Sequence, residues 1–564
     1  MNRRTVLVLA GLLLVQSVIL ALAYTPAPHS GGDNAGYISL AHSLLDRGAY
    51  LELWDPGEAP HTKYPPVFPI VLAMAILLGA KSWAALKLVP AFSTVLAVAF
   101  TFLWARERRG MALGVVVALL LGLSDTAVYY SRWVLSDPTF LALTMAALWA
   151  LQISRGSRED SRTAESRGEG DRWLWVGMAL VILAYFTRSA GLPLAAATLL
   201  WLGLQRRWKA LAGFALAFGV PAALWWLRGR VLGGSAYVSE FWMVNPYQPE
   251  LGTVGPWGLV VRVKENLVAY VTFFLPSGVV GQGRSFLLPL GVGLGLVTLL
   301  GWVRALRERA SAAEFFFPLY FGLILLWPPA WSGDRFALPL LPLMFFYAGT
   351  AVLWLTDSLP VRVRQGAAAL LVLALAFPAA RQWQRTSAGA ELCRELTRLG
   401  FPRECLSEAR REYFAVAEWS GENLPDGAVV TTRKPRIFFL MSGVKAVSIP
   451  LVTDPDEFLA RVREGGSRFI LLDILDTISE FYVFPVLLDR FPDFCGMVEV
   501  GVPGEAGTQL LGLVEGVQGV DPDQEDSGYL PGCPEDMVRT DPLEGGLAKG
   551  WGIPLLLRER KAGR

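Results

Sequence analysis

Charged residues are scarce in this sequence. Only 18% of its 564 residues are Asp, Glu, Lys or Arg, whereas 53% are hydrophobic, and the formal net charge is only +2. An ordinary soluble enzyme needs a more polar surface than this composition supplies, so the composition predicts a membrane protein. The small net charge also provides no basic surface for nucleic acid, which we therefore exclude as a partner.

Histidine is even scarcer, and this bears on metal binding. The three histidines, His29, His42 and His61, lie in one N-terminal segment that also carries carboxylates. Imidazoles and carboxylates bind divalent cations, but no pair here has the close spacing of a zinc motif, so solvated side chains are the favoured interpretation. The sequence also has no Gly-Lys-Ser/Thr loop for nucleotide phosphates. We therefore expect no required cofactor, with a divalent cation at these histidines as the alternative.

Cysteine is confined to the last third of the chain. The four cysteines are Cys393, Cys405, Cys495 and Cys533. An even number allows disulfides in an oxidising compartment, and three pairings are open. We expect at least one disulfide.

Long apolar runs are what the sequence has in abundance. Eleven of them can cross about 30 Å of hydrocarbon, although the shorter runs need flanking residues to reach that length. The first is too long for a cleaved signal peptide and is expected to be retained. The runs span residues 5–24, 86–104, 111–123, 136–153, 173–187, 191–204, 211–227, 288–303, 314–328, 336–356 and 366–380.

The apolar run 64–78 could be a twelfth span, but the distribution of basic residues argues against it. If this run does not cross, all basic links fall on the same side as the Arg3-Arg4 terminus, which is the positive-inside pattern. We therefore expect an interfacial helix that begins among Pro65, Pro66 and Pro69. The basic links span 106–109, 155–172, 206–209, 304–309 and 362–364.

This topology predicts three parts. Residues 1–381 form a transmembrane domain with a large outer loop at 25–85, and smaller outer segments follow at 124–135, about 228–287 and 329–335. Residues 382–520 have the composition of a soluble domain, in which helical patterns at 408–419 and 455–463 alternate with strand-like runs at 428–432, 444–449 and 469–472. We expect a small extracytoplasmic α/β domain there. Residues 521–564 are expected to be an irregular tail.

Asp33 is the first candidate site residue. It follows a flexible Gly-Gly pair and precedes a helical pattern that includes Tyr37. One interpretation is a helix N-cap. The other is a general base at the membrane surface, where a carboxylate can accept a proton from an acceptor group. Both can be true together.

Arg188 interrupts a long apolar stretch between residues 173 and 204. A guanidinium at that depth needs a partner, and such residues are commonly functional. It could lie in a hydrated turn, but a phosphate clamp is favoured because Lys63, Arg132 and Arg335 are expected on the same face.

Asp137 and Arg335 each allow two interpretations. Asp137, directly before Pro138, could cap a helix, or it could bind an acceptor, a cation or Arg132. Arg335 could be an interfacial anchor or a partner of Asp334.

Taken in order, these elements resemble the GT-C superfamily of membrane glycosyltransferases. The resemblance is to bacterial relatives of the dolichyl-phosphate-mannose protein mannosyltransferases and of the lipid A aminoarabinose transferase. It rests on Gly32 to Tyr37, on Lys63-Tyr64-Pro65-Pro66, on 131–138, on 187–191, and on Asp334-Arg335-Phe336 with the Leu-Pro pattern of 338–342. The stretch 419–443 resembles the outer domain often appended to such enzymes.

The resemblance implies roles for these residues. Asp33 would be the catalytic base, and Lys63, Arg188 and Arg335 would bind the phosphate of a polyprenyl-phosphate-linked sugar. An acceptor or cation site would be shaped by Asp137, Arg132 and Tyr37. Many relatives carry Asp-Glu at the first motif, whereas Asn34 follows Asp33 here, so a paired carboxylate is absent at this point of the sequence.

The function predicted from this resemblance is an inverting transfer of a sugar to an envelope lipid, glycan or protein. The protein would lie among the lipids of the bacterial cytoplasmic membrane and act on its outer face. Three alternatives remain open: an oligosaccharyltransferase or polymer ligase of the same architecture, a lipid flippase or transporter, and a non-catalytic envelope assembly protein.

Overall fold

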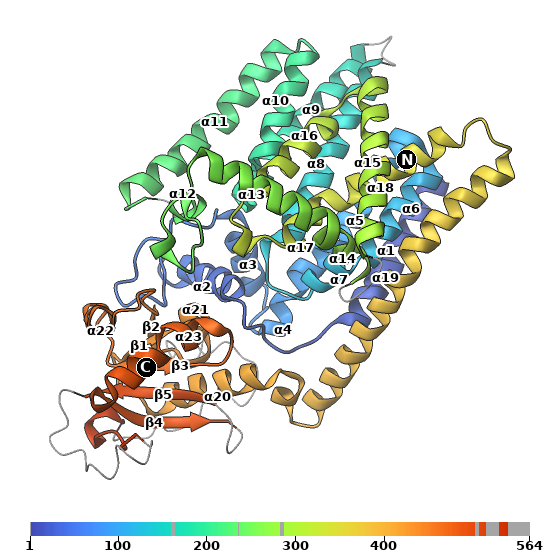
Figure 1. Cartoon of the computed structure of the whole chain (residues 1–564). Coiled ribbons are helices and arrows are strands. Elements are labelled where there is room, and N and C mark those ends of the chain that lie inside the picture. Colours follow the sequence, from blue (N-terminus) through green and yellow to red (C-terminus); the bar gives the residue numbers. More distant parts are fainter. Residues whose placement is uncertain are drawn as a thin grey trace.

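The computed structural model describes residues 2–159, 164–234, 236–281, 287–501, 507–514 and 530–539. A bundle of helices forms most of the molecule, and a small domain with a β-sheet lies at one end of it (Figure 1). The predicted architecture, a mostly helical chain with a C-terminal α/β domain, is confirmed at this level.

Each of the eleven apolar runs coincides with a helix of the bundle. Within the described residues, six helices are long and apolar enough to cross a membrane. Several others, such as α6 with 13 residues, are shorter, so the number eleven stays a prediction. The helices are α1 (Arg3–Ala23), α5 (Leu88–Arg109), α6 (Met111–Leu123), α8 (Ser136–Glu159), α9 (Ala164–Thr187), α10 (Leu192–Leu204), α11 (Trp208–Val231), α15 (Leu287–Arg309), α16 (Ala312–Leu325), α18 (Leu341–Leu355) and α19 (Val361–Arg398).

The doubtful run 64–78 forms the short helix α3 (Val67–Leu77). Its 11 residues span about 17 Å, about half of the hydrocarbon thickness. Pro66 precedes the helix, and Pro69 lies in its first turn, where proline is tolerated. This length agrees with an interfacial helix that does not cross.

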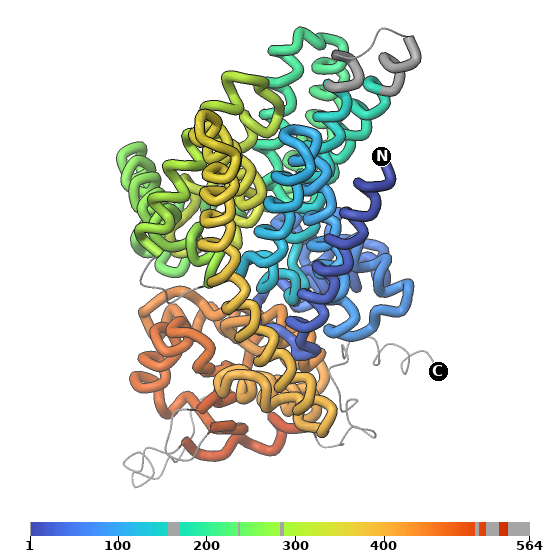
Figure 2. Tube along the Cα trace, turned by 90° about the vertical axis from the view of Figure 1, so that its right-hand side faces the viewer, coloured from blue at the N-terminus to red at the C-terminus, as the bar shows by residue number. Residues whose placement is uncertain are grey.

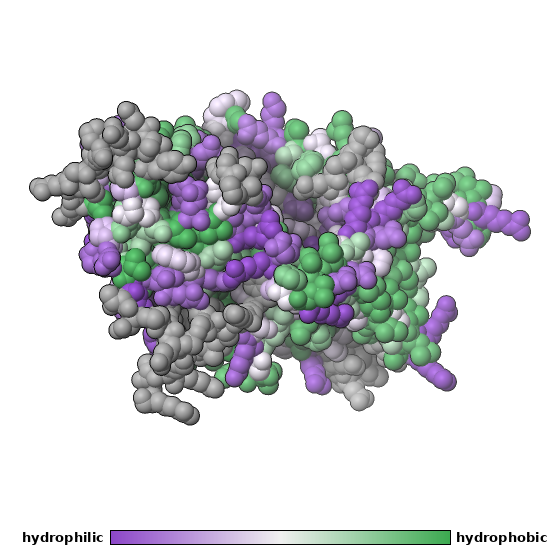
Figure 3. Space-filling view, turned by 90° about the horizontal axis from the view of Figure 1, so that it is seen from below, coloured by the Kyte–Doolittle hydropathy of each residue, from purple (hydrophilic) through white to green (hydrophobic). Residues whose placement is uncertain are grey.

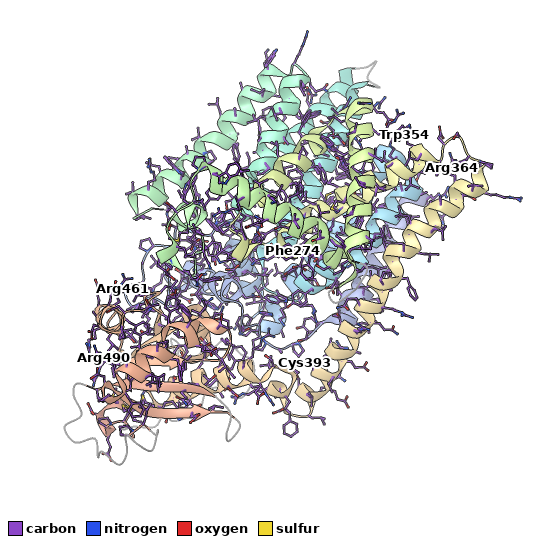
Figure 4. All side chains as sticks on the ribbon, in the orientation of Figure 1. Phe274, Trp354, Arg364, Cys393, Arg461 and Arg490 are labelled. Atoms are coloured by element: carbon purple, nitrogen blue, oxygen red, sulfur yellow. A yellow bond between two sulfur atoms is a disulfide. The ribbon has the colours of Figure 1, made fainter. Side chains whose placement is uncertain are left out.

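The basic links gather at one end of the bundle. Arg108 contacts Glu314 at 2.7 Å, and Arg155 donates to the carbonyl of Ala310 at 2.7 Å, so three of the links meet there. Arg364, in the first turn of α19, lies at the end opposite to the sheet domain (Figure 4). The clustering fits the predicted sidedness.

The predicted outer segment 228–287 is largely helical. It contains α12 (Ala236–Trp242), α13 (Pro256–Ala269), a π-helical turn at Tyr270–Phe274 and α14 (Leu275–Val280). Two polar residues of α13, Arg262 and Asn266, are buried and donate to carbonyls at the end of α16, whereas Lys264 and Glu265 are exposed. Trp257 of α13 is 76% exposed, so this helix presents an apolar face outward.

The outer domain contains a five-stranded sheet with the order β2-β1-β3-β5-β4. The first three strands, β1 (Val429–Thr432), β2 (Lys445–Ser448) and β3 (Phe469–Leu472), are parallel and match the predicted strands. Strands β4 (Phe494–Val500) and β5 (Thr508–Leu513) are antiparallel and were not predicted. The helices of the domain are α20 (Glu408–Asn423), α21 (Pro435–Ser442), α22 (Pro455–Glu464), α23 (Thr477–Tyr482) and α24 (Phe484–Asp489).

One face of this sheet shares a hydrophobic core with the first outer loop. The core joins Tyr64 and Phe68 of that loop to Phe438 of α21 and Phe469 of β3. The opposite face, which includes Ile470, packs on α22 and α24. Because successive strand residues point to opposite faces, β3 contributes to both cores. The outer domain is therefore packed onto the loop rather than suspended from the bundle.

Helix α19 connects bundle and outer domain without interruption, as the tube view shows (Figure 2). It passes through the predicted domain boundary at residue 381. A disulfide between Cys393 and Cys405 joins its end to the segment that follows, and a second joins Cys495 to Cys533. The expectation of at least one disulfide is confirmed. The predicted tail 521–564 lies outside the described residues except for 530–539, where Gly532 pairs with Gly496 of β4.

Candidate active site

A cavity of about 970 Å³ lies where the bundle, the first outer loop and the outer domain meet. Phe274, one of its lining residues, lies near the middle of the molecule, above the outer domain (Figure 4). Seen from the outer-domain end, hydrophilic residues spread across the face, whereas hydrophobic residues cover the flank of the bundle (Figure 3). The cavity therefore lies between an apolar bundle and a polar end.

Asp33 lines this cavity from the first turn of α2 (Gly32–Asp46). The N-cap of α2 is Gly31, so the prediction that Asp33 caps the helix is wrong. Its two oxygens serve different partners: Oδ1 accepts from the Tyr64 hydroxyl at 2.6 Å, and Oδ2 accepts from Nη1 of Arg335 at 2.7 Å. The carboxylate is thus placed by tertiary contacts.

These contacts also determine the ionisation of Asp33. Burial raises the pKa of the carboxyl, but Arg335, the hydrogen bond from Tyr64 and the charge of Arg436 lower it by more. The pKa of Asp33 is therefore held well below its usual range, and the group is a carboxylate at neutral pH.

Asp137 joins Asp33 into a network with two arginines. Its Oδ1 pairs with Arg188 at 2.7 Å, and its Oδ2 accepts from Nε of Arg335 at 2.9 Å. Asp137 lies in the first turn of α8, where its oxygens bind these arginines rather than cap the helix. The predicted partner of Arg335, Asp334, accepts instead from Tyr130 at 3.1 Å.

Arg188 is not a hydrated turn residue. Its side chain is only 13% exposed, and it lies at the break between α9 and α10 with its guanidinium over the ring of Phe336. It also donates to the Ser136 hydroxyl at 3.4 Å, which lies 2.9 Å from the hydroxyl of Tyr37. The structure thus brings Asp33, Tyr37, Asp137, Arg188 and Arg335 together.

Lys63 lies on another wall of the cavity. Its ammonium contacts the carboxylate of Glu240 at 2.7 Å and lies 5.2 Å from the ring centres of both Tyr237 and Trp331. Aromatic faces stabilise a cation without neutralising it.

Arg132 lies outside this site. It is absent from the cavity lining, and its guanidinium lies 5.3 Å from the ring centre of Tyr129. The prediction that Arg132 shares a site with Asp137 is wrong because Asp137 is already bound by two other arginines.

The three histidines contact different residues. His29 accepts from the amide of Gly31, and His42 lies inside α2 at 3.5 Å from Asp46. His61 contacts Glu52 through Nδ1 at 2.7 Å and accepts from the Tyr64 amide through Nε2 at 2.8 Å. Burial lowers the pKa of His61 to about 4, so the ring is neutral. Among the described residues, no group of three or more His, Cys, Asp or Glu side chains could hold a metal ion.

The outer domain supplies residues that sequence reasoning missed. Arg433 and Lys434, from the turn between β1 and α21, and Arg436, from the first turn of α21, line the cavity. Arg436 donates to the Tyr64 hydroxyl, and its guanidinium lies 5.0 Å from the ring centre of Trp54. Three basic residues directly after a predicted strand were the available signal, because the end of a strand places its turn at one edge of the sheet.

Basic side chains are prominent in the lining of the cavity. Six line it, Lys63, Arg188, Arg335, Arg433, Lys434 and Arg436, against four acidic ones, Asp33, Glu52, Glu240 and Asp334. Two further carboxylates outside the lining pair with some of these basic residues: Asp137 with Arg188 and Arg335, and Asp476 with Arg433 and Lys434. Arginine forks suit the oxygens of a phosphate group, and a desolvated wall strengthens their attraction.

Comparisons with known proteins identify the fold. No protein-family model matches the sequence, and no curated protein matches it. Among solved structures, the chain is similar to ArnT from Cupriavidus metallidurans bound to undecaprenyl phosphate, with 15% identity, a TM-score of 0.54, and coverage of 92% of this chain and 99% of that one.

The chain is also similar to oligosaccharyltransferase structures from Archaeoglobus fulgidus. One, tethered to an acceptor peptide, matches at 14% identity and a TM-score of 0.55, over 89% of this chain and 74% of that one. Another, in complex with an inhibitory peptide and a dolichol-phosphate, matches at 14% identity and a TM-score of 0.55, over 91% of this chain and 75% of that one. The chain therefore has the GT-C fold that its motifs resemble.

Proposed function

We propose that this protein is an inverting membrane glycosyltransferase that moves a sugar from a polyprenyl-phosphate carrier to an acceptor. The observation that carries the proposal is the contact of Asp33 with Arg335, which Asp137 links to Arg188, in a cavity lined by more basic than acidic residues. Such a site offers a proton acceptor next to groups that stabilise a phosphate leaving group.

The donor phosphate would bind at the end of the cavity nearest the bundle. Arg188 and Arg335 share Asp137, and Arg335 also contacts Asp33, but these contacts use only some of the five N–H groups of each guanidinium, so a further anion can be bound. Lys63 supplies a third cation from the outer loop. The similar ArnT and archaeal structures contain undecaprenyl phosphate and dolichol-phosphate, which supports a lipid-linked phosphate as the ligand.

The chemical step would be a single displacement. Asp33 takes the proton of the acceptor hydroxyl or amine as the acceptor atom forms its bond to the anomeric carbon. The bond between that carbon and the phosphate oxygen breaks, and its electron pair leaves with the polyprenyl phosphate. Attack from the side opposite to the leaving group inverts the anomeric configuration, while Arg188, Arg335 and Lys63 stabilise the phosphate charge.

Arg335 links the activation of the base to the binding of the donor. With the cavity empty, its contact with Oδ2 of Asp33 lowers the pKa of Asp33 and leaves a poor base. A donor phosphate competes for the same guanidinium. As Arg335 turns to the phosphate, the pKa of Asp33 rises, so the base becomes competent when the donor is present.

Transfer of an oligosaccharide is the second candidate, favoured by the shared fold with the archaeal oligosaccharyltransferase. It uses the same base and phosphate site and differs in the size of the donor glycan. In either case we propose a cytoplasmic-membrane location with the cavity and the outer domain on the extracytoplasmic face, as the basic links at the opposite end of the bundle favour.

The test is transfer in vitro from a synthetic polyprenyl-phosphate sugar by purified variants. Asp33→Asn keeps the shape of the side chain but loses the proton acceptor, so turnover should fall about a hundredfold or more. Arg188→Lys keeps the charge but loses the fork, so kcat/KM for the donor should fall about tenfold.

Two variants serve as controls. Asp55→Asn changes a carboxylate in the same loop that bonds only local amides, and Arg207→Lys changes an arginine that contacts Asp171 at the opposite end of the bundle. Near-wild-type rates for Asp33→Asn and Arg188→Lys, in protein as monodisperse as the controls, would remove the active site from this cavity.

A further inference from the structure

The outer domain contributes a side chain to the base itself. We propose that Arg436 is a positioning residue for sugar transfer: it holds the Tyr64 hydroxyl so that this hydroxyl donates to Asp33 and fixes the carboxylate for catalysis. The inference rests on the proposed function and deepens it, because it makes the C-terminal domain part of the active site.

The direction of the two hydrogen bonds follows from the chemistry of the groups. A guanidinium can only donate, so the Tyr64 oxygen must accept from Nη1 of Arg436. The single hydroxyl proton of Tyr64 is then directed to Oδ1 of Asp33, at 2.6 Å. Without Arg436 that proton could rotate to another acceptor. Arg436 therefore keeps the hydroxyl proton of Tyr64 directed at Asp33, although Arg436 and Asp33 belong to different domains.

The surroundings hold this pair in place. Gly36 of α2 allows the approach, because a Cβ there would lie 3.1 Å from both Cδ of Arg436 and the Tyr64 ring. The guanidinium lies 5.0 Å from the ring centre of Trp54 and 5.2 Å from that of Tyr64. His61 fixes the Tyr64 backbone through the hydrogen bond to its amide. Both partners thus have little freedom to move.

This arrangement assigns different tasks to the two oxygens of Asp33. Oδ1 stays bound through Tyr64 to the outer domain, whereas Oδ2 is bound by Arg335, the arginine that a donor phosphate would attract. Only Oδ2 becomes free when the donor binds. The outer domain therefore selects the oxygen that takes the proton and keeps the carboxylate plane turned toward the acceptor.

The experiment measures transfer against pH for the wild type, Arg436→Ala, Arg436→Lys and Tyr64→Phe. Arg436→Ala should lower kcat about tenfold, since the carboxylate loses its fixed orientation. It should also move the acid limb of kcat to higher pH, because kcat reports the donor-bound enzyme, in which Arg335 has turned to the phosphate and the removed charge of Arg436 had helped to keep the base ionised. Arg436→Lys, which still donates and still carries charge, should restore most of both effects.

A double variant tests whether the two residues act as one unit. If Arg436 works through Tyr64, adding Tyr64→Phe to Arg436→Ala should cost little beyond the single change. Arg490→Ala is the matched control, because Arg490 lies at the far edge of the outer domain (Figure 4) and pairs only with acidic residues there. It should leave both the rate and the acid limb unchanged.

Two results would overturn the proposal while leaving the proposed function intact. One is a lower kcat in Arg436→Ala with an unmoved acid limb, which would indicate a role only in docking the domain. The other is full additivity of Arg436→Ala and Tyr64→Phe. A wild-type protein that transfers no sugar would instead overturn the proposed function and, with it, the role of Arg436.

Discussion

The two ends of the bundle both contain a buried network of arginine and carboxylate, and they differ in what surrounds it. At the end that carries the basic links, which is the predicted inner end, Arg108 pairs with Glu314 at 2.7 Å, and Glu314 also accepts from Ser311 and Tyr347. Glu314 is 0% exposed, and neither residue lines the cavity of the outer end. Every oxygen of this carboxylate has a partner, as a structural ion pair requires.

At the outer end, the arginines and carboxylates do not form separate one-to-one pairs. Arg335 spans Asp33 and Asp137, Arg188 takes the remaining oxygen of Asp137, and the network adjoins about 970 Å³ of open space. Burial and pairing are common to both ends, so neither identifies a functional site. The open cavity, lined by more basic than acidic residues, distinguishes the outer end.

The largest effect should come from breaking the inner network. Glu314→Gln keeps the side chain's shape and its hydrogen bond to the Ser311 amide but leaves Arg108 buried without a counter-charge. We expect the free energy of unfolding to fall by about 3–5 kcal/mol, with unchanged turnover per folded molecule. Thermal melts and transfer rates in detergent measure the two quantities. A variant that melts normally but transfers slowly would reverse the roles assigned to the two ends.

Arg335→Lys tests the network at the outer end. A single ammonium cannot bridge Asp33 and Asp137 as the guanidinium does through Nη1 and Nε. We expect kcat/KM for the donor to fall about thirtyfold, or about 2 kcal/mol in barrier, with little change in melting temperature. Arg108→Lys is the matched change at the inner end, and it should lower stability without altering the rate. Equal behaviour of the two variants would erase the distinction between the ends.

The smallest effect concerns a buried carboxylate that has no arginine. Asp473 of the outer domain is 2% exposed and accepts from the Ser479 hydroxyl at 3.0 Å. Burial raises the pKa of Asp473 to about 6 from 3.8. The folded state therefore binds the proton more tightly, and this group's contribution to stability is lost as pH rises from about 4 to about 6.

Asp473→Asn should remove that dependence and raise the melting temperature at pH 7 by about 2–4 °C. At pH 4, where the wild-type carboxyl is largely protonated, the two proteins should melt alike. Melting curves at both pH values provide the check. A variant less stable at pH 7 would mean that the ionised group gains more from its hydrogen bonds than burial costs.

Local patterns were sufficient to predict the helices of the eleven apolar runs, but not the helices α12, α13 and α14 between them. Each apolar run became a helix because backbone groups in an apolar setting must bond within their own segment. The parallel strands β1 to β3 were also predicted, since continuous apolar residues such as Phe469 to Leu472 indicate a buried strand. Strands β4 and β5 escaped prediction because glycine and polar residues interrupt them, and their place depends on pairing with one another and with β3.

The partners in the site could not be predicted in the same way. Asp33 and Arg335 lie 302 positions apart, and Arg436 and Tyr64 lie 372 apart. Nothing in the neighbourhood of Arg335 distinguishes a pair with Asp334 from one with Asp33, so the sequence offered Asp334 as one possible partner, whereas the structure pairs Arg335 with Asp33 and Asp137. The type of each residue was enough to name it as a candidate site residue, whereas the identity of its partner depends on how the helices pack.

Helix α19 gives this site an order of assembly. Synthesis proceeds from the N-terminus, so Asp33, Arg188 and Arg335 are all in the chain before α19 emerges, and Arg436 follows only after it. In the orientation proposed here, the residues after α19 must be exported before they can fold. A partly made chain would already hold the base and the phosphate-binding arginines in the membrane, but not the contact that fixes the base. Sugar transfer would therefore reach its full rate only after the last part of the protein has crossed, which limits how much lipid-linked donor unfinished molecules consume.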